Sequence, residues 1–150
     1  MHQIFPYKIY SINETFCRVL NRRVNKEKGA GAYDELTDPN GPWVGDNYYL
    51  FLNDFEGNVV AHRIKKLVGK NLYGVRDVKG TPFVAVSQEI VRSEAGFGWY
   101  DWWWPKPNET EPSHKVGFSM RVPGQKILVG SAIYDMNPSE IKKILKKQSP

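Results

Sequence analysis

Hydrophobic residues near the N-terminus repeat at the three- and four-residue steps of an amphipathic helix. They are Ile12, Phe16, Val19, Leu20 and Val24. The pattern predicts a long N-terminal helix over about residues 11–28, with Ser11 and Glu14 at the spacing of a capping box. Such a helix can pack on the rest of the domain or against a second copy of itself, so a homodimer through this helix is an open expectation.

The rest of the chain shows short apolar runs separated by turn residues, which is the pattern of antiparallel strands. Strand alternation places His62, at the end of the second run, on the same face as Val60. Gly57 provides the positive φ that the turn between the first two strands needs. The predicted strands cover residues 48–52, 59–62, 98–104, 115–122 and 126–134.

The segments between the strands carry the remaining elements. Residues 33–46 are rich in turn formers and predict an irregular connection, and residues 63–80 predict a long loop with one short helical turn. Thr81 as N-cap and Pro82 at the first helical position predict a second helix. Its buried face would consist of Phe83, Val86, Ile90 and Val91.

A short basic helix over about residues 138–147 ends the chain. The order of elements is then helix, two strands, loop and helix, three strands, helix. This order predicts one α+β domain over residues 1–150, in which a PAS-like five-stranded antiparallel sheet occupies about residues 46–135. The long N-terminal helix precedes the sheet, and loops and a helix cover one face of it.

Composition is that of a single soluble globular domain, because the 150 residues are 41% hydrophobic and 25% charged. The formal net charge of +5 owes much to the lysines of the C-terminal segment. It therefore predicts no nucleic-acid groove. No apolar run reaches the length of about 18 residues that a membrane span needs, and the N-terminus lacks a signal-peptide pattern. A periplasmic or other extracytoplasmic location would require that a signal or anchor had been removed.

No motif predicts catalysis, a cofactor or a metal site. The chain has neither a nucleophile elbow nor a phosphate-binding glycine loop. His2, His62 and His114 lack the spacing of metal ligands, and the single Cys17 excludes an internal disulfide or a CxxC site. We therefore expect no catalytic residue and no cofactor.

Aromatic residues make up 13% of the chain and concentrate in the third predicted strand. Alternation places Tyr100, Trp102 and Trp104 on one face of that strand and Trp99 and Trp103 on the other. The first three rings can either line an enclosed ligand pocket or form an exposed platform for a sugar, a nucleic acid or a protein. Burial of these rings distinguishes the two alternatives.

Between positions 30 and 135 the chain carries an ordered set of glycines, aromatic residues and polar residues. The set consists of Gly45, Asp46, Tyr49, Phe51, Asp54, Gly57, Ala61, His62, Leu67, Val68, Gly69, Lys70, Asn71, Asp77, Gly80, Gly98, Trp99, Trp104, Pro105, Lys115, Val129, Gly130 and Tyr134. It resembles the pattern of single Cache domains, the PAS-like extracytoplasmic sensor modules of chemoreceptors and histidine kinases. The resemblance implies a non-enzymatic domain that binds a small carboxylate or a similar metabolite in one pocket and passes the occupancy to a partner through its terminal helices.

Carried over by position, the resemblance implies a ligand-binding set from four strands. Lys115 would supply a positive charge, His62 a hydrogen-bond donor, and the aromatic rings a dry wall. Lys70, Asn71 and Asp77 would order the loop that closes the site. Val59 stands where relatives that bind di- or tricarboxylates have an arginine, which favours a smaller ligand. The ligand-binding set is Tyr49, Phe51, His62, Tyr100, Trp102, Trp104 and Lys115.

Overall fold

A computed structural model describes residues 17–26, 30–106 and 108–146. Five antiparallel strands form one sheet in the order β2-β1-β5-β4-β3, which confirms the predicted α+β, PAS-like fold. Residues 17–26 are helical, as predicted, and the remainder of the predicted 11–28 helix lies outside the described residues. The strands are β1 (Tyr48–Asp54), β2 (Val59–Ala61), β3 (Phe97–Pro105), β4 (Pro112–Arg121) and β5 (Ile127–Tyr134).

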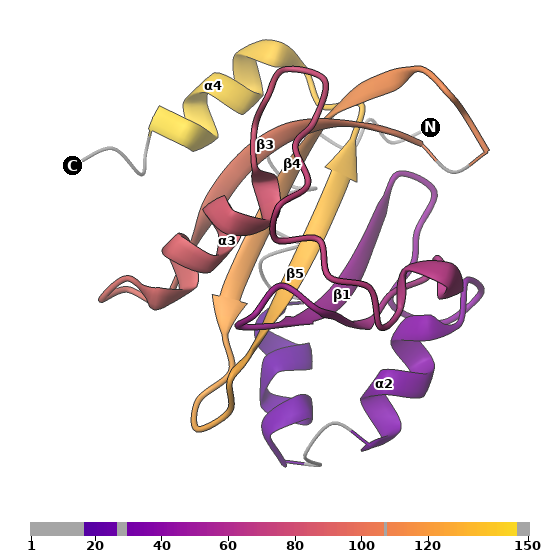
Figure 1. The fold of residues 1–150 in the computed structure, drawn as a ribbon, viewed down its shortest axis with the longest axis vertical. Coiled ribbons are helices and arrows are strands. Elements are labelled where there is room, and N and C mark those ends of the chain that lie inside the picture. The colour runs from indigo at the N-terminus through magenta and orange to yellow at the C-terminus, as the bar shows by residue number, and fades with distance from the viewer. Residues whose placement is uncertain (1–16, 27–29, 107, 147–150) are drawn as a thin grey trace, which may run out of the picture.

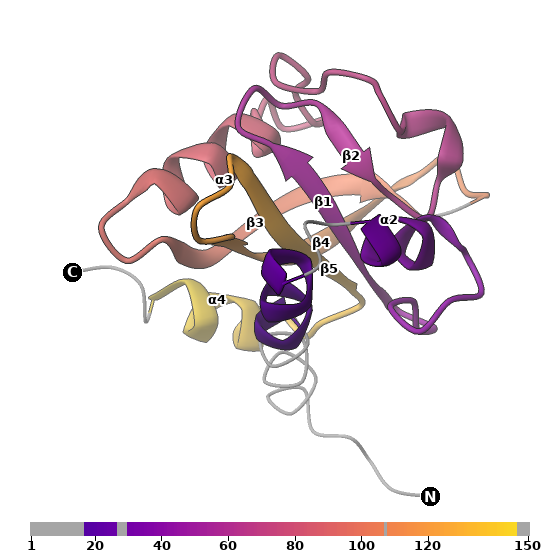
Figure 2. The same cartoon turned by 90° about the horizontal axis from the view of Figure 1, so that it is seen from below.

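Helices pack on both faces of the sheet (Figures 1 and 2). One face carries the helix of residues 17–26, α2 (Ala30–Thr37) and α4 (Pro138–Lys146), which bury apolar residues such as Leu20, Leu36 and Ile141 against the strands. The opposite face carries α3 (Phe83–Arg92) and the connection of residues 63–80, which contains the short 3-10 helix η1 (Lys65–Leu67). We call residues 63–80 the covering loop.

The strand order forces the chain to cross one face of the sheet. Strand β2 lies at one edge and β3 at the other, although they follow each other among the strands of the sequence. The connection between them, the covering loop followed by α3, therefore spans the whole width of this face (Figure 1). A cavity between this connection and the sheet is therefore closed on one side by the strands and on the other by the covering loop and α3.

The sequence did not predict α2, which begins at Ala30 and extends into the segment of residues 33–46 that was interpreted as an irregular connection. Gly31 lies in its first turn, where a glycine lowers helix propensity. Tertiary contacts stabilise the helix instead, since Ala32 and Leu36 are fully buried. Glu35 pairs with Arg23 of the preceding helix, and Trp43 donates its indole N–H to the same carboxylate at 2.9 Å.

The predicted start of the second helix is wrong by one position. Pro82 is the N-cap of α3, without a side-chain capping bond, and Thr81 lies before it. Val86 and Ile90 are only half-buried, because the helix face that packs on the sheet is rotated slightly from the predicted one. The buried residues of α3 are Phe83, Val84, Ser87, Gln88 and Val91.

The predicted alternation in the second strand is also wrong. Leu52 pairs with Ala61 and Asn53 pairs with Val59, so Val60 is an extra residue in a β-bulge. The bulge shifts the alternation by one position. As a result His62 shares the face of Val59, while Val60 packs against the core on the other side of the sheet.

Candidate functional site

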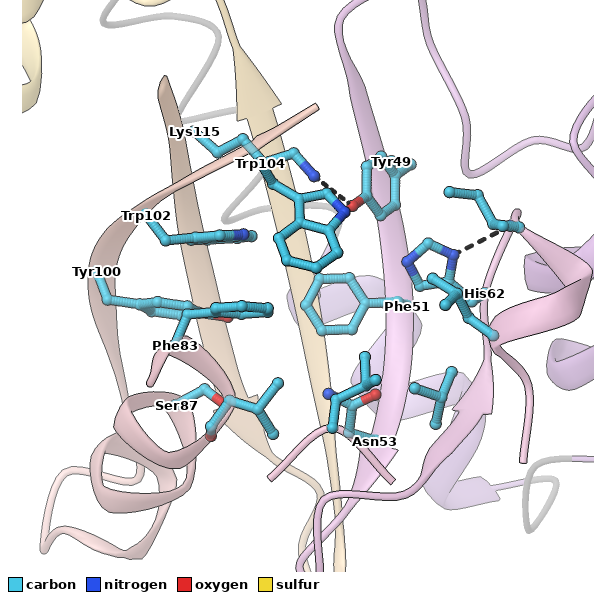
Figure 3. Close-up of a pocket in the computed structure, with 15 residues that line it drawn as sticks. Tyr49, Phe51, Asn53, His62, Phe83, Ser87, Tyr100, Trp102, Trp104 and Lys115 are labelled. Carbon is cyan, nitrogen blue, oxygen red and sulfur yellow. Dashed lines mark hydrogen bonds between the residues drawn. The ribbon is translucent and has the colours of Figure 1, made fainter. Parts of the chain in front are cut away.

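A small cavity of about 50 Å³ lies between the sheet and its roof of covering loop and α3 (Figure 3). Strand β1 contributes Tyr49 and Phe51, and His62 follows directly after β2. Strands β3 and β4 supply the opposite wall. All seven residues of the predicted ligand-binding set line this cavity: Tyr49, Phe51, His62, Tyr100, Trp102, Trp104 and Lys115.

Aromatic rings form one wall of the cavity. Tyr100 and Trp102 stack with centroids 5.1 Å apart, and Phe83 of α3 lies parallel to Trp102 at 5.5 Å. Gly117 of β4 permits this arrangement, because a Cβ atom there would lie 2.6 Å from the Trp102 ring. Gly130 of β5 gives the ring of Phe51 the same close approach to the backbone. Two glycines of the sheet therefore let large rings lie flat on it.

Lys115 is the only charged side chain among the described residues that line the cavity, and it is only 1% exposed. Its Nζ donates a hydrogen bond to the hydroxyl of Tyr49 at 2.8 Å. The same atom lies over the rings of Tyr134 at 4.5 Å and Trp102 at 5.4 Å. No described carboxylate pairs with it. Burial, with a smaller effect of Arg63, lowers the pKa of Lys115 to about 7.

His62 also lines the cavity, as a neutral ring. Burial, and then the charges of Lys115 and Arg63, lower its pKa to about 3. Its Nδ1 accepts a hydrogen bond of 3.0 Å from the backbone N–H of Ile64 (Figure 3). The proton of the neutral ring therefore resides on Nε2, which makes Nε2–H a hydrogen-bond donor.

The far end of the cavity is polar but uncharged. The Tyr100 hydroxyl lies 2.9 Å from the hydroxyl of Ser119, and Ser87 bonds the carbonyl of Val84. Asn53 is buried, and among the described residues its Oδ1 has no hydrogen-bond partner. The cavity thus has a cationic end at Lys115 and a neutral polar end at Asn53 (Figure 3).

Several lining residues were not part of the predicted set. Asn53 continues the alternation of Tyr49 and Phe51 along β1, so strand periodicity could have included it. Tyr134 does not line the cavity, but its ring supports Lys115 from β5. The lining residues from α3 and the covering loop depend on how these elements cross the sheet, which no local pattern encodes. They are Ile64, Leu67, Leu72, Phe83, Val84 and Ser87.

The covering loop is attached to both edges of the sheet. At the β2 edge, the N–H of Val59 donates to the carbonyl of Lys70, and the Asn71 side chain bonds Glu56 and Asn58. At the β3 edge, Asp77 accepts a hydrogen bond of 2.8 Å from the N–H of Trp103.

Asp77 also holds its own turn together. Its Oδ1 accepts the N–H groups of Lys79 and Thr81, and its carbonyl accepts that of Gly80. Burial alone would raise the pKa of Asp77, but the hydrogen bonds from Thr81, Trp103 and Lys79 bring it below its ordinary value. The ionised carboxylate is therefore the form that fits this position.

The part of the chain that the structure describes contains no group of three or more residues able to hold a metal ion. Within the same residues, no helix combines the length and the apolar character that crossing a membrane requires. Tyr100 and Trp102 are 5% and 4% exposed and Trp104 is half-buried, so the three residues do not form a solvent-facing platform.

Comparison with known proteins agrees with this architecture. The family model dCache_2, described as a Cache domain, matches residues 21–148. A solved structure described as the periplasmic sensor domain of a chemotaxis protein is 26% identical, with a TM-score of 0.70 over 85% of this chain and 93% of that chain. A methyl-accepting chemotaxis protein from Vibrio parahaemolyticus is also 26% identical, with a TM-score of 0.64 over 85% of this chain and 84% of that chain.

The fold is shared more widely. A structure described as the basis for carboxylic acid recognition by a Cache chemosensory domain is 20% identical, with a TM-score of 0.66 over 88% of this chain and 99% of that chain. No curated protein matches the sequence. The match of the family model over most of the chain shows that this protein belongs to the Cache-domain family of PAS-like, ligand-binding sensor modules.

Proposed function

We propose that this domain senses a small monocarboxylate, which binds to Lys115 in the cavity. The observation that carries the proposal is a buried cation without an acidic partner among the described residues. An isolated charge in an apolar site is costly, and an anion that pairs with it offsets part of that cost. The Nε2–H of His62 and the hydroxyl of Tyr49 supply neutral donors nearby, which suits the two oxygens of a carboxylate.

The size of the cavity limits the ligand to a few heavy atoms. About 50 Å³ is far below the roughly 300–1,000 Å³ of pockets that hold drug-sized ligands. The lining also supplies a single cation among the described residues, with Val59 where a second could stand. Both features favour a short monocarboxylate over a di- or tricarboxylate.

Signalling would begin at the roof of the cavity. Leu67 and Leu72 of the covering loop and Phe83 of α3 line the cavity directly, so a ligand contacts the same elements that close it. A ligand shifts the equilibrium between two arrangements of these elements only if it binds one of them more tightly. We propose that a partner protein, or a second copy paired through the N-terminal helix, binds one of the two arrangements preferentially and so responds to the ligand. This interaction would take place outside the cytoplasm.

Acetate and acetamide provide a matched test, because they have nearly the same shape and differ in charge. Calorimetric titration should show binding of acetate and at least about tenfold weaker binding of acetamide, since a charged hydrogen bond contributes roughly 1.5–3 kcal/mol. Lys115→Met should abolish the preference, and Lys66→Met, which removes an exposed charge outside the cavity, should leave it unchanged. Equal affinity for the two compounds would overturn the proposal.

Acetate binding should also depend on pH. The groups that face Lys115 are Tyr49, Tyr134, Trp102, neutral His62 and Arg63. The pKa of Lys115 is about 7 without ligand, and the anion binds the protonated form. Affinity should therefore be highest below pH 7 and should fall by up to about tenfold for each pH unit above it. Titrations in two buffers of different ionisation enthalpy should show proton uptake at pH 8.

A further inference from the structure

Lys115 is unusual in a second respect, because its surroundings suit the neutral amine as well as the ammonium ion. We propose that the neutral form of Lys115 is a nucleophile that captures a small aldehyde or ketone as a reversible imine inside the cavity. The inference rests on the cavity of the proposed function, but it assigns Lys115 a covalent chemistry that anion binding does not require.

The geometry shields Nζ from water and places no described carboxylate beside it. The side chain is 1% exposed, and its only hydrogen bond to a described residue is the 2.8 Å bond to the neutral phenol of Tyr49. Three aromatic rings surround Nζ at 4.5 to 5.4 Å. Desolvation of this kind is one of the ways in which proteins activate lysines that form Schiff bases.

The pKa of about 7 agrees with this geometry. Near neutral pH about half of the Lys115 side chains would carry a free electron pair, whereas a lysine in water, with a pKa of about 10.4, is neutral in fewer than roughly one molecule in a thousand. The fold therefore raises the population of the nucleophile by a factor of several hundred or more.

Tyr49 is placed to move the protons that imine formation requires. The Lys115 nitrogen attacks the carbonyl carbon, a C–N bond forms, and the carbonyl oxygen takes a proton to give a carbinolamine. The hydroxyl then takes a proton and leaves as water, the nitrogen gives up its remaining proton, and a C=N bond remains. One amine and one carbonyl compound give one imine and one water, with no change of oxidation state. Burial raises the pKa of Tyr49, so its phenol stays neutral and can act only by passing a proton along its hydrogen bond with Lys115.

Reductive trapping tests the inference in the native protein. The domain is incubated with limiting acetaldehyde and cyanoborohydride at pH 7, and ethylated lysines are mapped by peptide mass spectrometry. Lys115 should be labelled at least about tenfold faster than the exposed Lys65 and Lys66, because burial keeps much of the Lys115 amine neutral at pH 7. The preference should vanish in denaturant, which removes the cavity, and Tyr49→Phe should slow labelling of Lys115 alone.

A parallel sample without reductant, measured by native mass spectrometry, detects an imine that the hydride donor cannot reach. Labelling of Lys115 no faster than that of Lys65 and Lys66, together with no adduct in the native spectrum, overturns the inference. Adding acetate to the labelling reaction tests the imine inference and the proposed monocarboxylate site separately. Slower labelling of Lys115 in the presence of acetate supports both the imine inference and the monocarboxylate site. Labelling that acetate does not slow leaves the imine chemistry standing and contradicts the monocarboxylate site.

Discussion

At the scale of a residue, Lys115 makes the unliganded protein less stable than it could be. The pKa falls from 10.5 to about 7 on folding, so the folded state holds this proton more weakly than the unfolded chain does. Below pH 7 the side chain is charged in both the folded and the unfolded state, so burying the charge lowers the free energy of unfolding by its full amount. Between pH 7 and about 10 the cost declines, because the folded protein releases the proton first.

Lys115→Met should therefore stabilise the unliganded domain at pH 6, by an amount on the order of a few kcal/mol. The gain should shrink as the pH rises from 7 to 10. Chemical denaturation at several pH values measures both effects, and Lys66→Met, an exposed position, is the control. A variant that is less stable than the parent at every pH would show that packing of the lysine stem outweighs the cost of the buried charge.

At the scale of an element, the covering loop depends on a single carboxylate at the β3 edge. Asp77→Asn keeps one oxygen but replaces the other with an N–H₂ group, which cannot accept a hydrogen bond. Either the N–H of Trp103 or the N–H groups of Lys79 and Thr81 then lose their hydrogen-bond acceptor. The loss should lower the free energy of unfolding by about 1–3 kcal/mol.

Hydrogen exchange of residues 75–81 should accelerate in Asp77→Asn, and acetate should leave the cavity faster. Asp34→Asn, on the exposed side of α2, is the control. In the parent protein the same loosening should occur in acid, because the pKa of Asp77 is below its ordinary value and its contribution is lost as the pH falls through that pKa. Unchanged exchange in the variant would contradict this role of Asp77.

Strand periodicity predicted much of the site, and it failed where the backbone departed from regular geometry. Tyr100, Trp102 and Trp104 share a face because β3 alternates without interruption. The alternation also places Val60 on the face of His62, which is wrong, because the bulge at Val60 shifts it: His62 lines the cavity as expected, and Val60 packs on the other side of the sheet. No residue of that strand signals a bulge. Residues from α3 such as Ser87 could not be predicted, since their position depends on how the helix crosses the sheet.

At the scale of the whole molecule, ligand binding should stabilise the roof more than the opposite face. Acetate at about 100 times its dissociation constant contributes roughly 2.7 kcal/mol to the folded state. Hydrogen exchange should slow mainly in the covering loop and α3, which line the cavity, and Lys115→Met should show no such change. Equal slowing in α3 and in α2, which packs on the other face, would argue against a roof that responds locally.

The attachment of the covering loop to both edges of the sheet also affects how readily the edge strands can pair with other molecules. Exposed edge strands present unpaired N–H and C=O groups that can recruit strands from other molecules, and β3 is long and rich in tryptophan. The bond from Trp103 to Asp77 occupies one such group at the β3 edge, and the segment around Lys70 occupies the β2 edge. We therefore expect the roof of the cavity also to reduce edge-to-edge association of the sheet.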